Sequence, residues 1–302
     1  MVLLDYTLSR LGDTGSVEVK VATLLILDFD GTMTDAEAEG APYREGYLDD
    51  LAILTGLSPA EVRILAARFE AEVAAEQGRF GWDFNGRIVA PAGVDPYLRV
   101  MPVARMILDE VGVFPDRTTR NRLLDGILYK YNYPKTHTAF RPGAFDLLTT
   151  VREQIETYVV TNSHTTPVQG KISRLAEEAG APGSLDWAVQ RVHGSARKYI
   201  IDDDFTAVPE ALTLPDLSRP VLLRRRLYFD ALDALRQKHG AEWSDVLVVG
   251  DIFELDLCLP LALGATVGLM TGPFTPAHER NYLAGHSRGH LLTELSEVLA
   301  LV

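Results

Sequence analysis

Three short runs of uninterrupted hydrophobic residues, each followed directly by polar residues, stand out along the chain. They cover residues 24–27, 158–160 and 246–249. Hydrophobic residues at consecutive positions, without alternation, indicate segments that are buried on both faces. We therefore predict that these runs are strands of a parallel sheet with helices on both sides.

Hydrophobic residues at helical spacing lie between and after these predicted strands. Three predicted helices carry, in order, Phe145, Leu148, Val151 and Ile155; Val168, Ile172, Leu175 and Ala179; and Tyr228, Ala231, Leu232 and Leu235. Pro142 suits the start of the first helix, while Gly180 and Gly240 suit the ends of the other two. A further strand is expected near residues 189–193. Strands that alternate with helices predict an open α/β sheet.

The pattern changes between about residues 35 and 138. Helical spacing of the hydrophobic residues predicts helices over 60–77, 101–111 and 120–131. The stretch 78–102 is rich in Gly and Pro and is predicted to be a loop or turn region. We therefore predict two domains, a core formed by residues 1–35 and 140–302 and a largely helical cap formed by residues 36–139.

Composition narrows the possible partners. The chain has 302 residues, of which 29 are Lys or Arg and 42 are Asp or Glu, so the formal net charge is −13. Binding to nucleic acid or to an anionic membrane needs a basic surface, so neither partner is expected. An acidic surface of this kind is expected to serve solubility.

Two features bear on where the protein is located. Cys258 is the only cysteine, so no intramolecular disulfide is expected and a reducing compartment is favoured. The first twenty residues contain no long hydrophobic stretch, and we expect neither a signal peptide nor a membrane span there. The charged residues of this segment are Asp5, Arg10, Asp13, Glu18 and Lys20. We therefore expect a soluble, cytoplasmic protein.

Asp28 and Asp30 directly follow the first predicted strand. Unpaired carboxylates buried at this point would each cost several kcal/mol, and a cation would remove that cost. Magnesium suits such hard oxygen ligands. Gly31 then permits a tight turn away from the strand, and Thr32 can form a local hydrogen bond. The alternative is an ordinary turn at the end of a strand, because Asp and Gly are common turn residues.

The other two predicted strands also end in polar residues. Thr161 and Asn162 follow the middle strand, and Asp251 and Asp256 follow the last one. Ligands of open α/β sheets gather at the carboxyl ends of the strands, so these side chains are expected to meet Asp28 at one edge. Carboxylates gathered there would repel one another without a cation. The sequence therefore predicts a Mg²⁺ site.

The segments 27–32, 160–162 and 249–256 resemble motifs one, two and four of the haloacid dehalogenase (HAD) superfamily, in the order of that family. The resemblance covers residues 20–35 and 140–270, but neither the cap nor the termini. It implies a Rossmann-like core with a parallel sheet, a mostly helical cap inserted after motif one, and phosphatase activity.

The resemblance also implies roles for individual residues. Asp28 would attack phosphorus and form an aspartyl-phosphate, and Asp30 would act as the general acid and then as the general base. Thr161 would donate a hydrogen bond to a phosphoryl oxygen, supported by Asn162.

The metal ligands implied by the same resemblance are Asp28, the backbone carbonyl of Asp30, and Asp251. Asp256 would hold the water ligands of the metal or orient a neighbouring group. Magnesium would then neutralise charge during phosphoryl transfer.

The cation of motif three has three candidates. Lys198 follows the strand expected near 189–193, although its separation from Asp251 is longer than is usual in the family. Arg225, within 224–226, has a separation nearer the usual one, and Lys171 lies within a predicted helix. We favour Lys198, because a lysine suits a compact positive charge. The stretch 201–220 is then an insertion without an assigned role.

Other candidate residues are weaker. His286 and His290 have the spacing of helical zinc ligands but lack a third ligand nearby. His137, His164 and His193 are expected to be surface or packing residues. In the cap, the possible substrate contacts are Tyr43, Arg44, Trp82, Asn85 and Arg87, and ordinary packing is the alternative for each of them.

The sequence favours a phosphatase that acts on a small phosphorylated metabolite, because a cap over a sheet edge suits small substrates. Dehalogenase chemistry does not fit the second aspartate, Asp30. Phosphonate cleavage through a Schiff base does not fit a cap without lysine between Lys20 and Lys130. A phosphomutase and a non-catalytic binding or regulatory module remain alternatives. The oligomeric state is left open.

Overall fold

A computed structural model describes residues 22–131 and 138–302 of the chain. The expectations for the first twenty residues and for His137 fall outside these residues. Within the described residues, no helix combines the length and the hydrophobicity that crossing a membrane requires.

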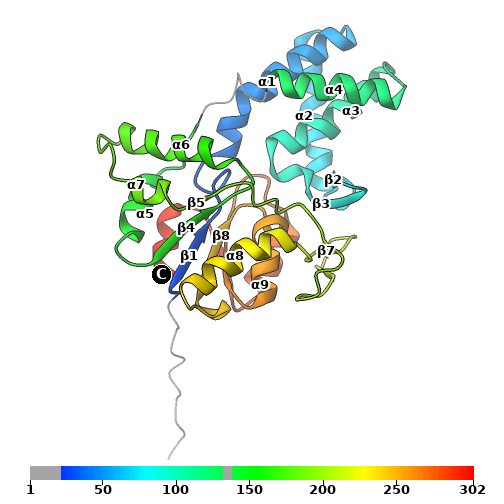
Figure 1. Cartoon of the computed structure of the whole chain (residues 1–302). Helices are drawn as coiled ribbons and strands as arrows, with labels where there is room; N and C mark the ends of the chain where they lie inside the picture. The colour runs from blue at the N-terminus through cyan, green and yellow to red at the C-terminus, as the bar shows by residue number, and fades with distance from the viewer. Residues whose placement is uncertain (1–21, 132–137) are drawn as a thin grey trace, which may run out of the picture.

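The core of the molecule is a six-stranded sheet in the order β10-β9-β8-β1-β4-β5 (Figure 1). The strands are β1 (Leu24–Leu27), β4 (Glu156–Val160), β5 (Val192–His193), β8 (Val246–Gly250), β9 (Thr266–Met270) and β10 (Gly289–Leu292). All neighbouring strands of this six-stranded sheet run parallel. The order reverses at β1, which pairs with β4 on one side and β8 on the other. A crevice for ligands is expected outside the carboxyl end of β1.

Alternate residues of β1 pack against different layers of helices. Leu24 and Ile26 contribute to one hydrophobic cluster, and Leu25 and Leu27 contribute to the opposite one. The first cluster includes residues of α8 (Arg226–Lys238), α9 (Cys258–Leu263) and α10 (Ala277–Ala284). The second includes residues of α5 (Ala144–Val151), α6 (Thr165–Glu178) and α7 (Asp186–Val189). Burial on both faces explains why the strand sequences are continuously hydrophobic.

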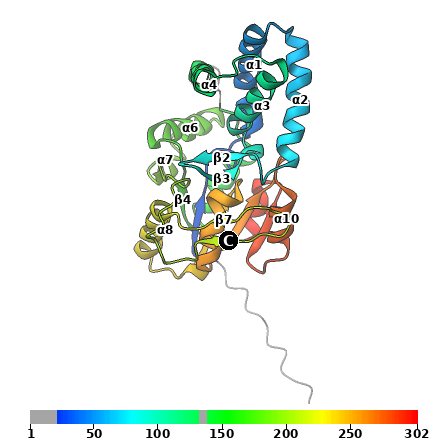
Figure 2. The same cartoon turned by 90° about the vertical axis from the view of Figure 1, so that its right-hand side faces the viewer.

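A second body lies over the carboxyl edge of the sheet, and we call it the cap (Figures 1 and 2). Its helices are α1 (Ala36–Thr55), α2 (Pro59–Ala75), α3 (Pro96–Val111) and α4 (Arg117–Tyr131). They share a hydrophobic cluster of their own. The antiparallel strands β2 (Gly81–Phe84) and β3 (Arg87–Pro91), followed by the short η1 (Ala92–Val94), lie between these helices and the core.

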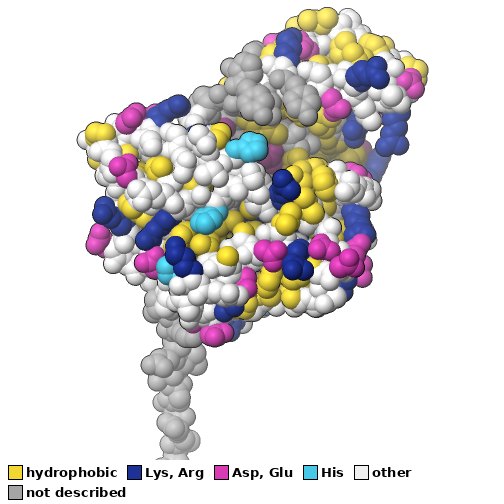
Figure 3. All heavy atoms as spheres, in the orientation of Figure 1, with side chains coloured by type: hydrophobic (Ala, Val, Ile, Leu, Met, Phe, Trp, Pro, Cys, Tyr) yellow, Lys and Arg dark blue, Asp and Glu magenta, His cyan; other side chains and the backbone are white. Residues whose placement is uncertain are grey.

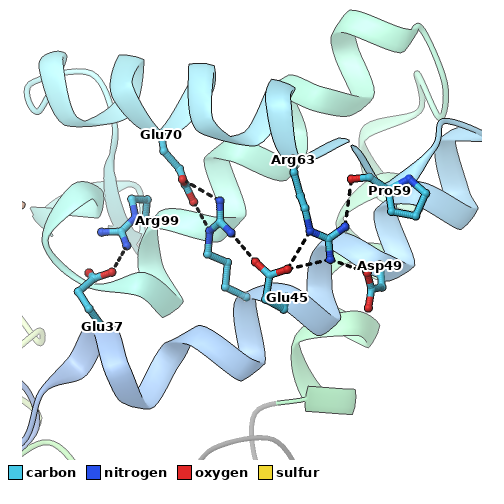
Figure 4. Close-up of polar contacts among 8 residues, drawn as sticks. Glu37, Glu45, Asp49, Pro59, Arg63, Glu70 and Arg99 are labelled. Carbon is cyan, nitrogen blue, oxygen red and sulfur yellow. Dashed lines mark hydrogen bonds and ion pairs between the residues drawn. The ribbon is translucent and has the colours of Figure 1, made fainter. Parts of the chain in front are cut away.

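Ion pairs join the first two helices of the cap (Figure 4). Arg44 of α1 binds Glu70 of α2 through both Nε and Nη2, at 2.6 and 2.9 Å. Arg63 of α2 binds Glu45 and Asp49 of α1. Pairs that reach solvent contribute little to stability, so their main effect is to orient the helices. Arg44, considered above as a substrate contact, thus binds glutamates of the cap itself.

The prediction of a loop over 78–102 is wrong. Asn85 and Gly86 have positive φ angles of 53° and 78°, so they form the tight turn of the β2–β3 hairpin. Pro96 then begins α3, and Asp95 caps this helix by accepting hydrogen bonds from the next backbone N–H groups. The Gly and Pro residues of this stretch therefore mark a hairpin turn and a helix start.

Other elements also differ from the prediction. The helix after Pro142 ends at Val151, so Ile155 lies beyond it. Val189 ends α7, which leaves β5 only two residues long. The predicted pattern also missed α1, where Gly40, Pro42 and Gly46 interrupt the hydrophobic spacing.

The stretch 201–220 forms an extra layer on the core. Its β6 (Ala211–Leu212) pairs antiparallel with β7 (Val221–Leu222). Four of its hydrophobic residues are buried with α8 and α9, namely Phe205, Val208, Leu214 and Leu217. The remaining short elements are η2 (Trp243–Asp245), η3 (Phe253–Leu257) and η4 (Leu295–Ala300).

Candidate active site

Asp28 lies at the end of β1 in contact with a buried lysine. Its backbone N–H donates to the carbonyl of Val249 in β8, so the carboxyl end of β1 is fixed against the neighbouring strand. Lys198 Nζ lies 2.6 Å from Asp28 Oδ1 and 2.8 Å from Asp256 Oδ1. The exposed fractions of Asp28 and Lys198 are 7% and 1%. Lys198 therefore supplies a positive charge directly to the predicted nucleophile.

The backbone on either side of Lys198 is tied to the segment after β4. Lys198 N donates to the Asn162 side-chain oxygen at 2.8 Å, and Ala196 N donates to the Thr161 carbonyl at 2.9 Å. Ser195 and Arg197 have positive φ angles of 57° and 50°, which are uncommon for residues other than glycine. A loop with two such residues needs support from its surroundings, and the Asn162 side chain gives part of it.

Three carboxylates gather beside this lysine. Asp28, Asp251 and Asp256 each offer an oxygen, and these oxygens lie within 4.8 Å of one another. Asp256 Oδ2 accepts a hydrogen bond from Ile252 N at 3.0 Å. Among the described residues, none donates a hydrogen bond to the Asp251 carboxylate. The group therefore offers several hard oxygen ligands, one of them without a protein partner, and this donor set fits a magnesium ion.

Glycines at the ends of β1 and β8 allow the carboxylates of Asp251 and Asp256 to lie close to the backbone. Gly31 has φ of +81°, and a Cβ atom there would lie 2.0 Å from Asp251 Oδ2. A Cβ atom on Gly250 would lie 2.4 Å from the Cβ of Asp256. No other residue type fits either position without moving a carboxylate.

The charges in this group shift one another's pKa values. Burial raises the pKa of Asp28 to about 7; Lys198 opposes this shift, and Asp256 adds to it. Burial, Asp256 and Asp28 raise the pKa of Asp251 well above its usual range. Burial lowers the pKa of Lys198, but Asp256 and Asp28 outweigh that effect and raise it, so the lysine stays charged. A cation bound here would keep the carboxylates ionised.

Asp30 has different partners from Asp28. Its carboxylate accepts hydrogen bonds from Ser163 Oγ at 2.6 Å and from Lys171 Nζ at 3.1 Å. Its side chain is 37% exposed, so it remains accessible to a substrate. Lys171 Nζ also pairs with Glu39 of α1 at 3.2 Å. Lys171, the third candidate for motif three, thus contacts the second aspartate and ties it to the cap.

Thr161 lies at the end of β4 and is 1% exposed. Its hydroxyl oxygen accepts a hydrogen bond from Ser163 N at 3.1 Å. No described residue accepts the hydroxyl proton, which leaves it available to a phosphoryl oxygen.

Arg225, the second candidate for motif three, is fully buried but does not contact Asp28. Its guanidinium donates to the backbone carbonyls of Lys198, Leu222 and Val89. Val89 belongs to β3 of the cap, so Arg225 joins the Lys198 loop to the cap.

Two of the candidate substrate contacts, both in the β2–β3 hairpin, contact residues of the core instead. The rings of Trp82 and Tyr199 lie 4.7 Å apart, centre to centre. Arg87 forms two hydrogen bonds with Asp203 of the stretch 201–220, at 2.7 and 2.6 Å. Tyr43 is buried in the cap. On the face drawn in Figure 3, the surface is hollowed between the cap and the core, and hydrophobic side chains border the hollow.

The predicted histidine pair is not arranged as a zinc site. His286 lies after α10, where its Nδ1 accepts a hydrogen bond from Arg288 N at 3.1 Å, and His290 lies in β10. Neither belongs to a group of described residues that could hold a metal.

Sequence comparison identifies no relative of this chain, because no family model matches it and no curated protein matches its sequence. Solved structures are similar to it. The structure of YfnB from Bacillus subtilis, described as a HAD-hydrolase bound to magnesium, has a TM-score of 0.52 and 18% identity and matches over 93% of this chain and 98% of that one. A haloacid dehalogenase-like hydrolase from Xanthomonas campestris has a TM-score of 0.48 and 11% identity over 93% and 96% of the two chains.

Proposed function

We propose, from the haloacid dehalogenase fold that this chain has and from the residues at the carboxyl edge of its sheet, that it is a magnesium-dependent phosphatase. The fold agrees with the class predicted from the sequence. The observation that carries the proposed activity is the position of Asp28, buried beside the charged Lys198 and next to Asp251 and Asp256.

Asp28 would act as the nucleophile. One of its oxygens would form a bond to phosphorus while the bond from phosphorus to the ester oxygen breaks. Asp30 would give its proton to the leaving oxygen and then remove a proton from the water that hydrolyses the aspartyl-phosphate. The water molecule would release inorganic phosphate and restore Asp28.

The remaining residues would stabilise charge. Lys198 would neutralise part of the phosphoryl charge, and the Thr161 hydroxyl would donate to a phosphoryl oxygen. Asp28, Asp251 and the Asp30 carbonyl would hold the metal, with Asp256 next to them. Magnesium, when bound, would supply further neutralisation of the transferring group.

A small phosphorylated metabolite suits the position of the cap over the sheet edge. The test is a screen of such compounds for phosphate release with magnesium and with a chelator. Release that needs magnesium and is lost in the Asp28→Asn variant would support the proposal. Transfer of the phosphoryl group to a second sugar phosphate would indicate a phosphomutase. Absence of turnover on every compound, including a generic aryl phosphate, would favour a non-catalytic module.

Magnesium is expected to raise the melting temperature of the protein, because it relieves repulsion among Asp28, Asp251 and Asp256. At a hundred times Kd, mass action gives about 2.7 kcal/mol, a rise in Tm on the order of 5 °C. Asp251→Asn should lose most of this rise while folding normally. Thermal melts monitored by circular dichroism check both proteins, and an unchanged rise in the variant would place the metal elsewhere.

The effect of magnesium on stability should grow as the pH rises from 5 to 8. The pKa of Asp28, about 7, is raised above its usual value of 3.8, so between these values the folded metal-free protein binds more protons than the unfolded one. Its free energy of unfolding therefore falls as the pH rises. Magnesium binds the ionised carboxylates, so it should restore the free energy of unfolding that the metal-free protein loses at high pH. Melts at pH 5 and 8, with and without magnesium, test this. A rise in Tm that is the same at both pH values would contradict it.

A further inference from the structure

A second group of ionisable side chains lies apart from Asp28 and shares no residue with its cluster. It consists of Glu254 in η3 and of His278 and Glu279 in the first turn of α10. Each offers one ligand atom, and these atoms lie within 4.8 Å of one another. The exposed fractions of Glu254, His278 and Glu279 are 0%, 8% and 0%. Two acids and an imidazole are thus enclosed together.

The charges of this group are not balanced by the protein. Arg219 binds both oxygens of Glu254, at 2.6 and 2.7 Å. Among the residues that the structure describes, no side chain donates a hydrogen bond to either oxygen of Glu279, near which lies the backbone N–H of Phe253, and Nε2 of His278 has no partner. One guanidinium and two carboxylates leave one buried negative charge. Such a charge costs several kcal/mol unless a cation or a proton neutralises it.

We propose that Glu254, His278 and Glu279 form a binding site for a divalent transition metal, with zinc as the best match. An imidazole together with carboxylates suits zinc, whereas magnesium prefers oxygen ligands alone. The unpartnered oxygens of Glu279 and the unpartnered His278 nitrogen are the atoms that such an ion would satisfy.

The site lies beside a cavity. His278 lines a cavity of about 500 Å³ between the cap and the core, together with Gln77, Ser218 and Asn281. A water molecule that enters from this cavity would supply the fourth ligand that a tetrahedral zinc ion takes when three come from the protein.

A metal at this site joins α10 to η3. Glu254 lies in the turn between Asp251 and Asp256, so the ion fixes the backbone that presents both aspartates. Its role is structural, and the proposal does not depend on phosphatase activity.

The test is calorimetric titration of the chelator-treated full chain with Zn²⁺. All proteins carry Asp251→Asn, which removes one carboxylate from the other cluster. The parent protein should bind one equivalent of zinc, in the presence of excess magnesium. Adding Glu279→Gln, which keeps the shape but removes the charge, should abolish this binding. The matched control is His290→Gln, at a half-buried histidine outside the site, and it should bind zinc like the parent.

Several outcomes would overturn the proposal. Failure of the parent to bind zinc would mean that Glu279 is neutralised by a proton or by Arg219. Equal binding with and without Glu279→Gln would place the zinc elsewhere. Circular dichroism checks the fold of each protein, and His278→Gln replaces Glu279→Gln if the latter does not fold. A crystal grown with zinc should show anomalous scattering between Glu254 and α10, and scattering only elsewhere would also reject the site.

Discussion

Asp28→Asn is expected to lower kcat by a factor on the order of 10⁴ to 10⁶, the scale observed when an enzyme loses its nucleophile. An amide oxygen is a poor nucleophile, and the substitution also removes one charge from the metal ligands. The change keeps the side-chain volume, so the buried contacts with Lys198 and Thr32 should leave the fold intact. Phosphate release at saturating magnesium measures the effect.

Asp30→Asn is expected to behave differently from Asp28→Asn. Loss of a general acid lowers kcat by about 10² to 10⁴. The loss of kcat/KM, which reports the steps up to departure of the alcohol, should be large for an alkyl phosphate and small for an aryl phosphate, because an aryl oxide leaves without needing a proton. Ser163 and Lys171 hold the carboxylate, so the asparagine should keep its place.

The control for both variants is Asp146→Asn, at an exposed position in α5. It makes the same chemical change at an exposed residue outside the strand-end cluster and should leave kcat unchanged. Wild-type turnover by Asp28→Asn would refute the assignment of Asp28 as the nucleophile. An equal loss of kcat/KM on both types of substrate in Asp30→Asn would refute the assignment of Asp30 as the general acid.

The position of the polar residues at the strand ends could be predicted from the sequence, because the carboxyl ends of neighbouring parallel strands lie at the same edge of the sheet. Leu27 pairs with Val159 in β4 and with Val249 in β8, so Asp28, Thr161 and Asp251 emerge at the same edge. Three uninterrupted hydrophobic runs in the sequence indicated this parallel sheet. The exact boundaries between the core and the cap, predicted at residues 35/36 and 139/140, remain a prediction.

The parts that the sequence did not reveal depend on contacts between distant segments. Glu39 meets Lys171 and Thr34 because α1 leaves the strand end at a particular angle, and α1 itself was not recognised. Ser163 directly follows Thr161 and Asn162, but its hydrogen bond to Asp30 depends on where β1 ends. Nothing local to either residue indicates the pairing.

The prediction from the sequence missed the β2–β3 hairpin of the cap for a different reason. Asn85-Gly86 is a strong hairpin signal, yet the surrounding Gly and Pro residues hid it within an apparent loop. The aromatic contact between Trp82 and Tyr199 depends on how the cap lies on the core, which residue spacing does not encode. The buried pair of His278 and Glu279 was missed for the same reason, because Glu254 approaches it only in the folded chain.

Lys198→Met is expected to lower kcat by about 10² to 10³, the scale of losing one preorganised charge-stabilising group. Methionine keeps most of the volume but leaves Asp28 and Asp256 without the ammonium that lies 2.6 and 2.8 Å away. The dianionic substrate would then meet carboxylates that only the metal neutralises.

Arg225→Met is the matched comparison, because it removes a buried cation that contacts carbonyls and not Asp28. Each carbonyl left unpaired costs about 1–3 kcal/mol, so Tm should fall markedly. The folded protein should lose less kcat than Lys198→Met, since the ammonium beside Asp28 remains. The measurement is kcat of both variants at saturating magnesium, at a temperature where circular dichroism shows both folded. Wild-type kcat in Lys198→Met beside a large loss in Arg225→Met would assign the motif-three charge to Arg225.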